Sequence, residues 1–226
     1  MKRSASSGQC GLCGGTFSKA SMTRHLTACL DKTAAAQAGS VVKPLKVFHI
    51  LVEGRYQPEY WMHLEVPVAA KLQTLDQFLR GIWLECCGHM SAFTIAKVTY
   101  SSSPSPESIF GGAREQSMAK KLYTVLTPGM PFDHEYDFGS TTNLKLKVAG
   151  ERTTKNSGEI TILARNNPPL IKCEKCGKPA TQVCSGCSFN EDAWFCDACA
   201  PDHECGEEMM LPVTNSPRVG ICGYTG

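Results

Sequence analysis

The chain has 226 residues, of which 42% are hydrophobic and 19% charged, and its formal net charge is +2. This is the composition of an ordinary folded protein, and the length suits one medium-sized core with smaller additions. No apolar stretch approaches the roughly 20 residues that a membrane-spanning helix needs. The polar start of the chain, MKRSASSG, lacks the pattern of a secretory signal. We therefore expect an intracellular, cytoplasmic protein.

The 13 cysteines are concentrated towards the two ends of the chain. Three lie between residues 10 and 29, two are adjacent at 86 and 87, and eight lie between 173 and 222. In a reducing compartment disulfides are rare, and clustered cysteines more often bind metal. The distribution predicts four parts: a small metal-binding unit (1–30), a linker (31–40), a central domain (41–168) and a second metal-binding unit with a tail (169–226).

The first unit contains Cys10-x2-Cys13-x11-His25-x3-Cys29. This spacing is typical of a closed zinc site with three thiolates and one imidazole. The last two donors are four residues apart, so on a helix they would share one face. The alternative, a redox pair of cysteines beside an unrelated histidine, accounts for fewer of the four positions.

The first unit resembles the ββα zinc fingers in their Cys-Cys-His-Cys variant, with a loop one residue shorter. The resemblance implies base-reading positions at Ser18, Ser21 and Arg24, of which only Arg24 is a strong base reader. Residues 1–32 carry five basic and one acidic side chain, a formal charge of +4. Contact of Arg24 and Lys19 with nucleic acid, contact with a protein and a purely structural role therefore all stay open.

The central domain is predicted to be α+β with a mostly antiparallel sheet. The main helix opens at Thr74, where Thr74 and Gln77 fit a capping box, and a shorter helix is predicted over 119–126. Residues 31–40 form the linker or a short helical extension. Runs rich in β-branched and aromatic residues predict strands at 45–52, 60–66, 92–100, 133–138, 144–148 and 160–163.

Two stretches of this domain resemble the plasmid pRiA4b ORF-3-like family. They are YWMHLEVPVAAKLQTLDQFLRGIWLECCGHMSAFTI (60–95) and FDHEYDFGSTTNLKLKV (132–148), the second with a Tyr-Asp-Phe-Gly element. After that element the family commonly has an acidic residue, a tryptophan and a histidine, where Ser140-Thr141-Thr142 stands here. The resemblance implies a compact α+β fold and no particular activity.

The second unit supplies eight further donors, the number that two tetrahedral sites need. We favour an interleaved pairing over a sequential one, because the first two CxxC pairs are separated by only seven residues. The interleaved sets are Cys173, Cys176, Cys196 and Cys199 on one ion, and Cys184, Cys187, His203 and Cys205 on the other. The pattern resembles the cross-braced two-zinc modules of the B-box and MYND families, which implies binding to proteins or capping of a neighbouring domain.

Charge and site pattern also bear on partners and catalysis. Residues 172–226 carry four basic and eight acidic side chains, a formal charge of −4, so phosphate binding by this unit is disfavoured. In the central domain, Cys86, Cys87 and His89 are interpreted as a helix end with buried thiols rather than as a nucleophilic site. The acidic run Asp133-His134-Glu135, with Asp137 after it, is interpreted as solvated strand residues followed by one turn-capping aspartate.

Three functional hypotheses follow. We favour a zinc-binding, non-enzymatic interaction or adaptor protein with three zinc ions per chain, a protein partner and neither catalytic nor other cofactor-binding residues. The first alternative is a nucleic-acid-associated protein that uses the basic finger. The second is an enzyme with an unrecognised site around Cys87, His89 and Asp137. The sequence assigns no role to Cys222.

Overall fold

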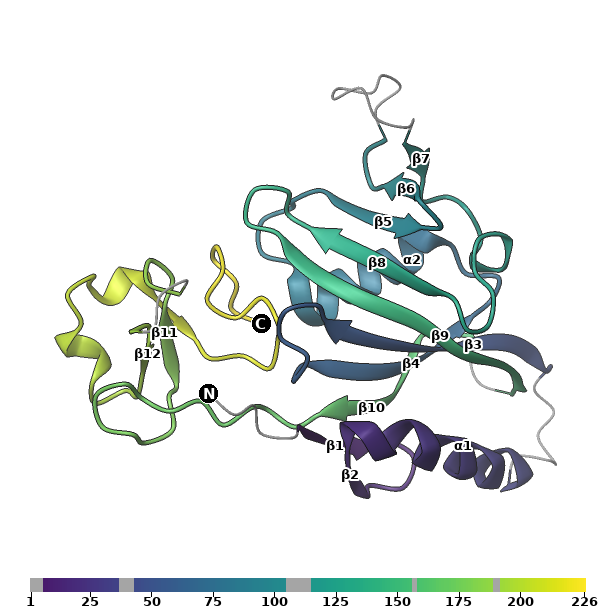
Figure 1. The fold of residues 1–226 in the computed structure, drawn as a ribbon, viewed down its shortest axis with the longest axis horizontal. Helices are drawn as coiled ribbons and strands as arrows, with labels where there is room; N and C mark the ends of the chain where they lie inside the picture. Colours follow the sequence, from purple (N-terminus) through teal and green to yellow (C-terminus); the bar gives the residue numbers. More distant parts are fainter. Residues whose placement is uncertain (1–5, 37–42, 105–114, 156–157, 189–191) are drawn as a thin grey trace.

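The computed structural model describes residues 6–36, 43–104, 115–155, 158–188 and 192–226. Within them the chain is α+β, with one large and mostly antiparallel sheet and a small cysteine-rich unit at either end (Figure 1). This confirms the predicted fold class. Residues 37–40 of the predicted linker lie outside the described residues. None of the described helices has the length and apolar character to cross a membrane.

Ten strands form the large sheet in the described part of the chain. They are β1 (Ser7–Cys10), β2 (Thr16–Ser18), β3 (Leu45–Gly54), β4 (Trp61–Pro67), β5 (Ser91–Ile95), β6 (Val98–Ser101), β7 (Gln116–Ser117), β8 (Pro131–Tyr136), β9 (Thr142–Thr154) and β10 (Thr161–Asn166). Their order is β2-β1-β10-β4-β3-β9-β8-β5-β6-β7, and each pairing is antiparallel except that of β6 with β7. The two strands of the N-terminal unit therefore extend the central sheet through β10.

The N-terminal unit contains the helix α1 (Lys19–Ala36). The central domain contains α2 (Leu72–Leu79), a π-helical turn η1 (Arg80–Leu84) that continues α2, and a 3₁₀ turn η2 (Leu122–Thr124). The C-terminal unit contains a three-stranded sheet of β11 (Gln182–Cys184), β12 (Trp194–Phe195) and β13 (Met210–Pro212), with 3₁₀ turns η3 (Ala200–Asp202) and η4 (Glu207–Met209). It lies beyond one end of the large sheet (Figure 1).

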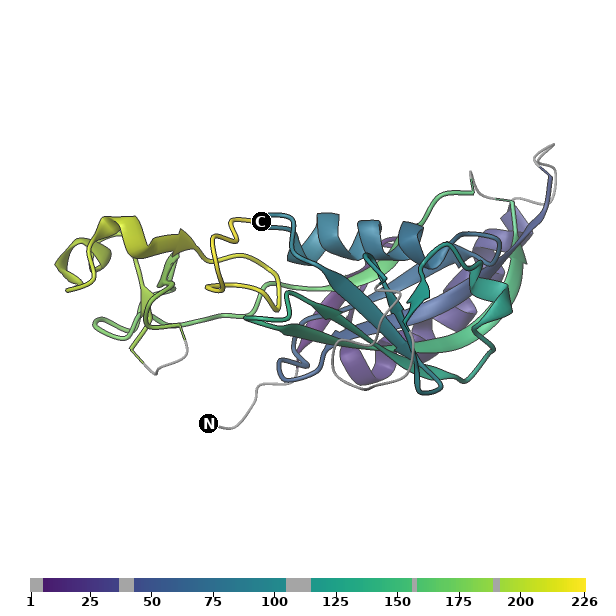
Figure 2. The same cartoon turned by 90° about the horizontal axis from the view of Figure 1, so that it is seen from above.

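Strand β4 is buried on both faces, because a different helix covers each of them. Met62 and Leu64 point into the main core, which also contains the apolar stripe of α2. Trp61 points the other way, into a second cluster with Met22 and Leu26 of α1. This follows from the period of two in a strand. Figure 2 shows α2 along one face of the sheet, with the N-terminal unit at its other face.

The main helix begins two residues earlier than predicted, at Leu72, and the predicted capping box is wrong. Lys71 is the N-cap, and its side chain makes no capping hydrogen bond. The free backbone N–H groups of Leu72 and Gln73 instead donate to the carbonyls of Lys120 and Met118. Contacts with a segment more than 40 residues later therefore cap this helix, and the local sequence around Lys71 does not indicate them.

Two further predictions are wrong. The single strand expected at 92–100 is the hairpin β5–β6, whose turn residues Ala96 and Lys97 have φ of 47° and 69°. Ala-Lys lacks the glycine or asparagine that marks such turns. The helix expected at 119–126 is reduced to η2, because the amides of Leu122 and Tyr123 donate to the carbonyls of Ala70 and Val68.

Candidate metal centres

The four donors predicted in the N-terminal unit lie together. Cys10 ends β1, Cys13 lies in the following turn, and His25 and Cys29 lie one turn apart on α1. All four donor atoms lie within 4.8 Å of one another. Cys13 Sγ is 3.4 Å from His25 Nε2, and Cys10 Sγ is 4.0 Å from Cys29 Sγ. Tetrahedral zinc places two sulfur ligands about 3.8 Å apart and a sulfur and a nitrogen about 3.5 Å apart, so the set suits such an ion.

The turn that carries Cys13 is built by the backbone. Gly14 donates its N–H to the Cys10 carbonyl at 2.8 Å, and Cys10 donates to the Gly15 carbonyl at 2.9 Å. Gly14 has a φ of 71°, which a glycine adopts without strain. The backbone N–H of Gly15 lowers the pKa of the Cys13 thiol, which favours the thiolate that metals bind. Phe17 stacks on the His25 ring, with centroids 3.7 Å apart.

The eight donors of the C-terminal unit fall into two sets, grouped as the interleaved pairing predicts. One set is Cys173, Cys176, Cys196 and Cys199, and the other is Cys184, Cys187, His203 and Cys205. The donors within each set lie within 4.8 Å of one another. The Cys176–Cys196, Cys187–His203 and Cys187–Cys205 distances are each 3.6 Å. Sequential pairing is not the grouping that the structure has.

The local chemistry of this unit favours metal binding. Burial alone would raise the pKa of Cys173, but backbone N–H groups of Cys196, Cys176 and Lys175 lower it to about 6. The apolar core between the sets is small, with Cys184, Phe195 and Ala200 as its buried members. So small an apolar core is typical of units that a bound metal stabilises. Each of the three predicted sets has four protein donors, so none leaves an open position for catalysis.

A fourth set, which the sequence reasoning did not find, consists of Cys86, Cys87, His89 and Cys222. The first three follow η1, and Cys222 lies in the tail after the C-terminal unit. The Cys86–Cys87 and Cys87–Cys222 sulfur distances are 3.6 Å, and His89 Nε2 lies 2.9 Å from Cys87 Sγ and 3.7 Å from Cys222 Sγ. The predicted pair of buried thiols is wrong, because Cys86 is half-buried and Cys87 exposed.

One signal in the sequence pointed to this set. The three predicted sets contain ten of the 13 cysteines, which leaves Cys86, Cys87 and Cys222 as the remainder. With His89 they are again three thiols and one imidazole. The four sets therefore include every cysteine in the chain.

A buried arginine lies beside the fourth set. Arg218 is fully buried, and its Nη2 is 2.7 Å from Asp137 Oδ2 and 3.3 Å from Cys86 Sγ. Asp137, with a φ of 64°, accepts hydrogen bonds from the amides of Gly139 and Ser140, so it is the predicted turn-capping aspartate. Burial alone would raise the pKa of Asp137, but Arg218 and these amides hold it below its ordinary value.

The donors do not form a Cys-His-Asp catalytic triad. In such a triad one imidazole nitrogen faces the thiol and the other faces the carboxylate. Here Nε2 of His89 faces both Cys87 Sγ, at 2.9 Å, and Asp137 Oδ2, at 3.5 Å. The same nitrogen cannot receive the proton of the thiol and be oriented by the carboxylate, so this geometry does not favour the enzyme hypothesis.

The acidic run of β8 does not converge on a metal site. His134 is buried and its Nε2 lies 2.8 Å from Oδ1 of Asp76 on α2. Asp133 forms an ion pair with Arg55, and Glu135 is exposed. The prediction of solvated strand residues is therefore wrong for His134, which is buried in the core.

The basic side chains of the finger differ in their surroundings. Arg24 is exposed. Lys19 forms an ion pair with Glu53 and donates to the Pro58 carbonyl at 2.8 Å. Ser18 and Ser21 are hydrogen bonded to each other at 2.9 Å. Of the proposed nucleic-acid contacts, Arg24 alone makes no hydrogen bond or ion pair with the residues that the structure describes.

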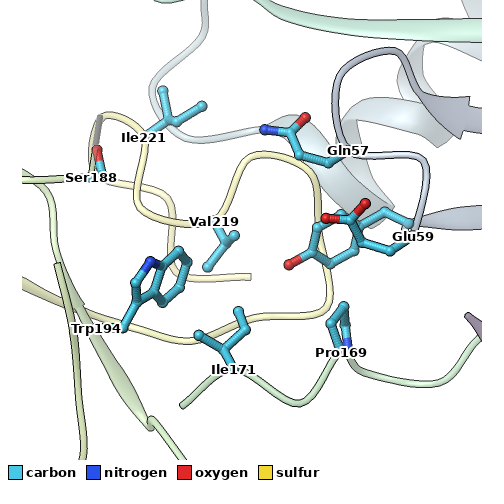
Figure 3. Close-up of a pocket in the computed structure, with 9 residues that line it drawn as sticks. Gln57, Glu59, Pro169, Ile171, Ser188, Trp194, Val219 and Ile221 are labelled. Atoms are coloured by element: carbon cyan, nitrogen blue, oxygen red, sulfur yellow. The ribbon is translucent and has the colours of Figure 1, made fainter. Parts of the chain in front are cut away.

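Two hollows lie beside the C-terminal unit. The larger lies between the finger, the central domain and the C-terminal unit, and is here called the finger–module groove, where the module is the C-terminal unit. It has a volume of about 1310 Å³, and its lining includes Ala20 and Thr23 of α1, Leu51 of β3, and Leu170 and Trp194. The smaller, of about 290 Å³ and shown in Figure 3, is lined by residues of the central domain and the C-terminal unit. Residues Glu59, Pro169, Ile171 and Trp194 line both.

No family model matches this chain, and no curated protein matches it. The fold is similar to a solved structure from Methanosarcina mazei Go1, the protein of unknown function MM3350. The TM-score is 0.45 and the identity 17%, over 59% of this chain and 76% of that chain. The resemblance to the pRiA4b ORF-3-like family stays a prediction.

Proposed function

We propose that this chain is a zinc-stabilised, non-enzymatic interaction protein, and that its finger–module groove binds a polypeptide segment with apolar side chains flanked by basic ones. The observation that carries the proposal is the combination of closed Cys/His sets on both sides of an open apolar groove. Metals in closed sites hold surfaces in shape and do no chemistry. The function of such a protein lies in what those surfaces contact.

The size and lining of the groove favour a polypeptide over a small molecule. Small-molecule pockets are usually about 300–1,000 Å³, and this groove has about 1310 Å³. Leu170, which lies in the lining between β10 and the C-terminal unit, is 91% exposed. An exposed leucine beside Ile171 and Trp194 is an anchor site for an apolar side chain.

Charge favours a basic partner. The C-terminal unit that forms one wall has a formal charge of −4, and thiolates in excess of the zinc charge make it more negative. Glu59 and Glu174 line the groove itself, together with Lys172 and with Lys19, whose charge is paired with Glu53. Basic side chains on either side of an apolar anchor would complement this surface, and they would also speed association.

The proposal is tested with two peptide libraries that share an apolar centre, one flanked by lysine and arginine and the other by glutamate and aspartate. The full-length zinc-loaded protein should select the basic library. The substitution Leu170→Ser in the protein should weaken its binding to the selected peptides at least tenfold, since burial of one leucine contributes about 1.5–3 kcal/mol. Tyr123→Ser is the matched control, because Tyr123 is 54% exposed and lines neither hollow.

Equal selection of both libraries, or no effect of Leu170→Ser, would contradict the proposal. Salt-sensitive binding of duplex DNA that is lost in Arg24→Ala, in the absence of peptide binding, would instead favour the nucleic-acid alternative.

Zinc is proposed for the three predicted sets because thiolate and imidazole donors in tetrahedral groups suit it.

A further inference from the structure

We propose that Cys86, Cys87, His89 and Cys222 form a fourth zinc site, which joins the tail of the chain to the central domain. The three predicted sets each combine donors from within one small unit. This set instead combines a loop of the central domain with a residue more than 130 positions later in the chain. The proposal concerns this site alone and does not depend on what the groove binds.

The spacing of the donor atoms is that of a tetrahedral site. The sulfur–sulfur distances of 3.6 Å equal those of the Cys176–Cys196 and Cys187–Cys205 pairs. They lie close to the edge of about 3.8 Å that zinc–sulfur bonds require. The 2.9 Å contact between Cys87 Sγ and His89 Nε2 is shorter than a zinc site allows. A rotation of either side chain must lengthen it by about 0.6 Å when the ion enters.

The backbone holds these donors in place from both sides. Gly88, between Cys87 and His89, has a φ of 79°, and its amide donates to Glu85 Oε1 at 2.6 Å. The amide of His89 donates to the hydroxyl of Tyr136 at 3.3 Å. Cys222 has a φ of 55°. This left-handed conformation costs a residue other than glycine roughly 1–2 kcal/mol, and it turns the Cys222 thiol towards the other three donors.

A buried cation lies beside the donors. The guanidinium of Arg218 donates a hydrogen bond to Cys86 Sγ at 3.3 Å. Three thiolates and one imidazole around Zn²⁺ leave a net charge of −1, next to the cationic end of the Arg218–Asp137 pair. Arg218 also binds Asp137. A hydrogen bond to a ligand sulfur, such as the one that Arg218 donates to Cys86, is usual around zinc sites.

The donor types narrow the choice of ion. Three sulfurs and one imidazole are soft to borderline ligands, which suit zinc rather than calcium or magnesium. With four protein donors the site is closed, so its role is structural.

The site would act on the tail, which is also packed on the central domain by other contacts. Ser216 Oγ donates to the buried carbonyl of Trp83 at 2.6 Å, and Val219 packs against the main core. Val219 and Ile221 line the smaller hollow beside Trp194 of the C-terminal unit (Figure 3). A metal bond at Cys222 therefore fixes the tail one residue beyond this contact and holds the C-terminal unit at its place beside the sheet.

The test is a zinc count on the full-length protein, prepared with zinc under reducing conditions and desalted. We expect four zinc ions per chain in the wild type, three in Cys222→Ser and four in Thr225→Ser, a matched change three residues later. The same count in the wild type and Cys222→Ser, whether three or four, overturns the proposal. So does a Cys87–Cys222 disulfide in the reduced preparation, found as a crosslinked peptide.

A second measurement on the wild type covers the case in which Cys222→Ser does not fold. Cys87 and Cys222 are exposed, so free thiols at these positions would react with iodoacetamide at once. A bound metal should slow their alkylation at least tenfold, and a chelator should restore the fast rate before the central sheet unfolds. Fast alkylation of both thiols in the zinc-loaded protein overturns the proposal.

Discussion

Replacing Arg218 by methionine should destabilise the protein by about 3 kcal/mol or more, because a buried carboxylate then loses its cation. The side chain of Arg218 is fully buried, and that of Asp137 is only 7% exposed. Arg218 also donates to the Ser140 carbonyl at 3.1 Å and to the Thr142 hydroxyl at 3.0 Å. Methionine keeps much of the apolar stem and none of these donors, so Asp137 remains charged where water reaches it poorly.

The magnitude can be stated for a melting experiment. Removal of one partner of a buried ion pair costs about 3–5 kcal/mol, and in a chain of this size each kcal/mol lowers the Tm by about 2–4 °C. Arg218→Met should therefore lower the Tm by at least about 6 °C, measured by circular dichroism in zinc-saturated, reducing buffer. Lys46→Met is the control. Its pair with Glu151 is 67% and 32% exposed, and such a pair contributes at most about 1 kcal/mol.

The double variant Arg218→Met/Asp137→Asn separates charge from packing. Asparagine keeps the oxygen that accepts the amides of Gly139 and Ser140 but removes the unpaired charge. The double variant should therefore be more stable than Arg218→Met by about 1 kcal/mol or more. If Arg218→Met costs no more than Lys46→Met, or if the double variant regains nothing, the ion pair is not what stabilises this region.

Three further predictions concern the finger, the buried histidines and the metal. Gly8→Ala should destabilise the pairing of β1 with β10 by about 1–3 kcal/mol, since a Cβ at this position would clash with the backbone carbonyl of Arg165. Gly150→Ala, whose Cβ meets nothing within 4 Å, should change stability little, and both are measured by urea unfolding. Burial lowers the pKa of His49 to about 4 and of His63 to about 3, from 6.5. As the pH falls, these histidines therefore gain protons in the unfolded chain before they do in the folded one, and the free energy of unfolding should drop by about 1.3 kcal/mol per histidine between pH 7.5 and 5.5. His49→Gln should reduce that drop. A urea midpoint that is the same at pH 7.5 and 5.5 in the wild type would contradict this prediction. Chelation of zinc should remove amide protection from the finger and the C-terminal unit before the central strands lose theirs, as hydrogen exchange can follow.

The local ligand patterns could be predicted from the sequence because they depend on short-range geometry. A CxxC pair requires one tight turn, and His25 and Cys29 require one turn of helix. The interleaved pairing in the C-terminal unit could be inferred from a short separation alone. Most strands of the central domain were also found, since alternation and β-branched residues are local signals.

The features that the sequence did not reveal depend on contacts between distant segments. The cap of α2 comes from carbonyls about 45 residues later in the chain. The hairpin turn at Ala96-Lys97 is an exception, since it is local but lacks the glycine or asparagine that marks such turns. The fourth set is divided between residues 86–89 and Cys222, so no spacing rule applies to it. Only the count of unassigned cysteines could have pointed to it.

The placement of the finger explains why it need not act as a separate nucleic-acid reader. Its strand β1 pairs with β10, and the indole N–H of Trp61 donates to the Ser6 hydroxyl at 2.8 Å. Lys19, at the start of α1, is held by Glu53 of the central sheet. The first turns of α1, which read bases in ββα fingers, here line the finger–module groove. A metal that stabilises this helix therefore also fixes one wall of the groove, and the C-terminal unit supplies the opposite wall in the same way.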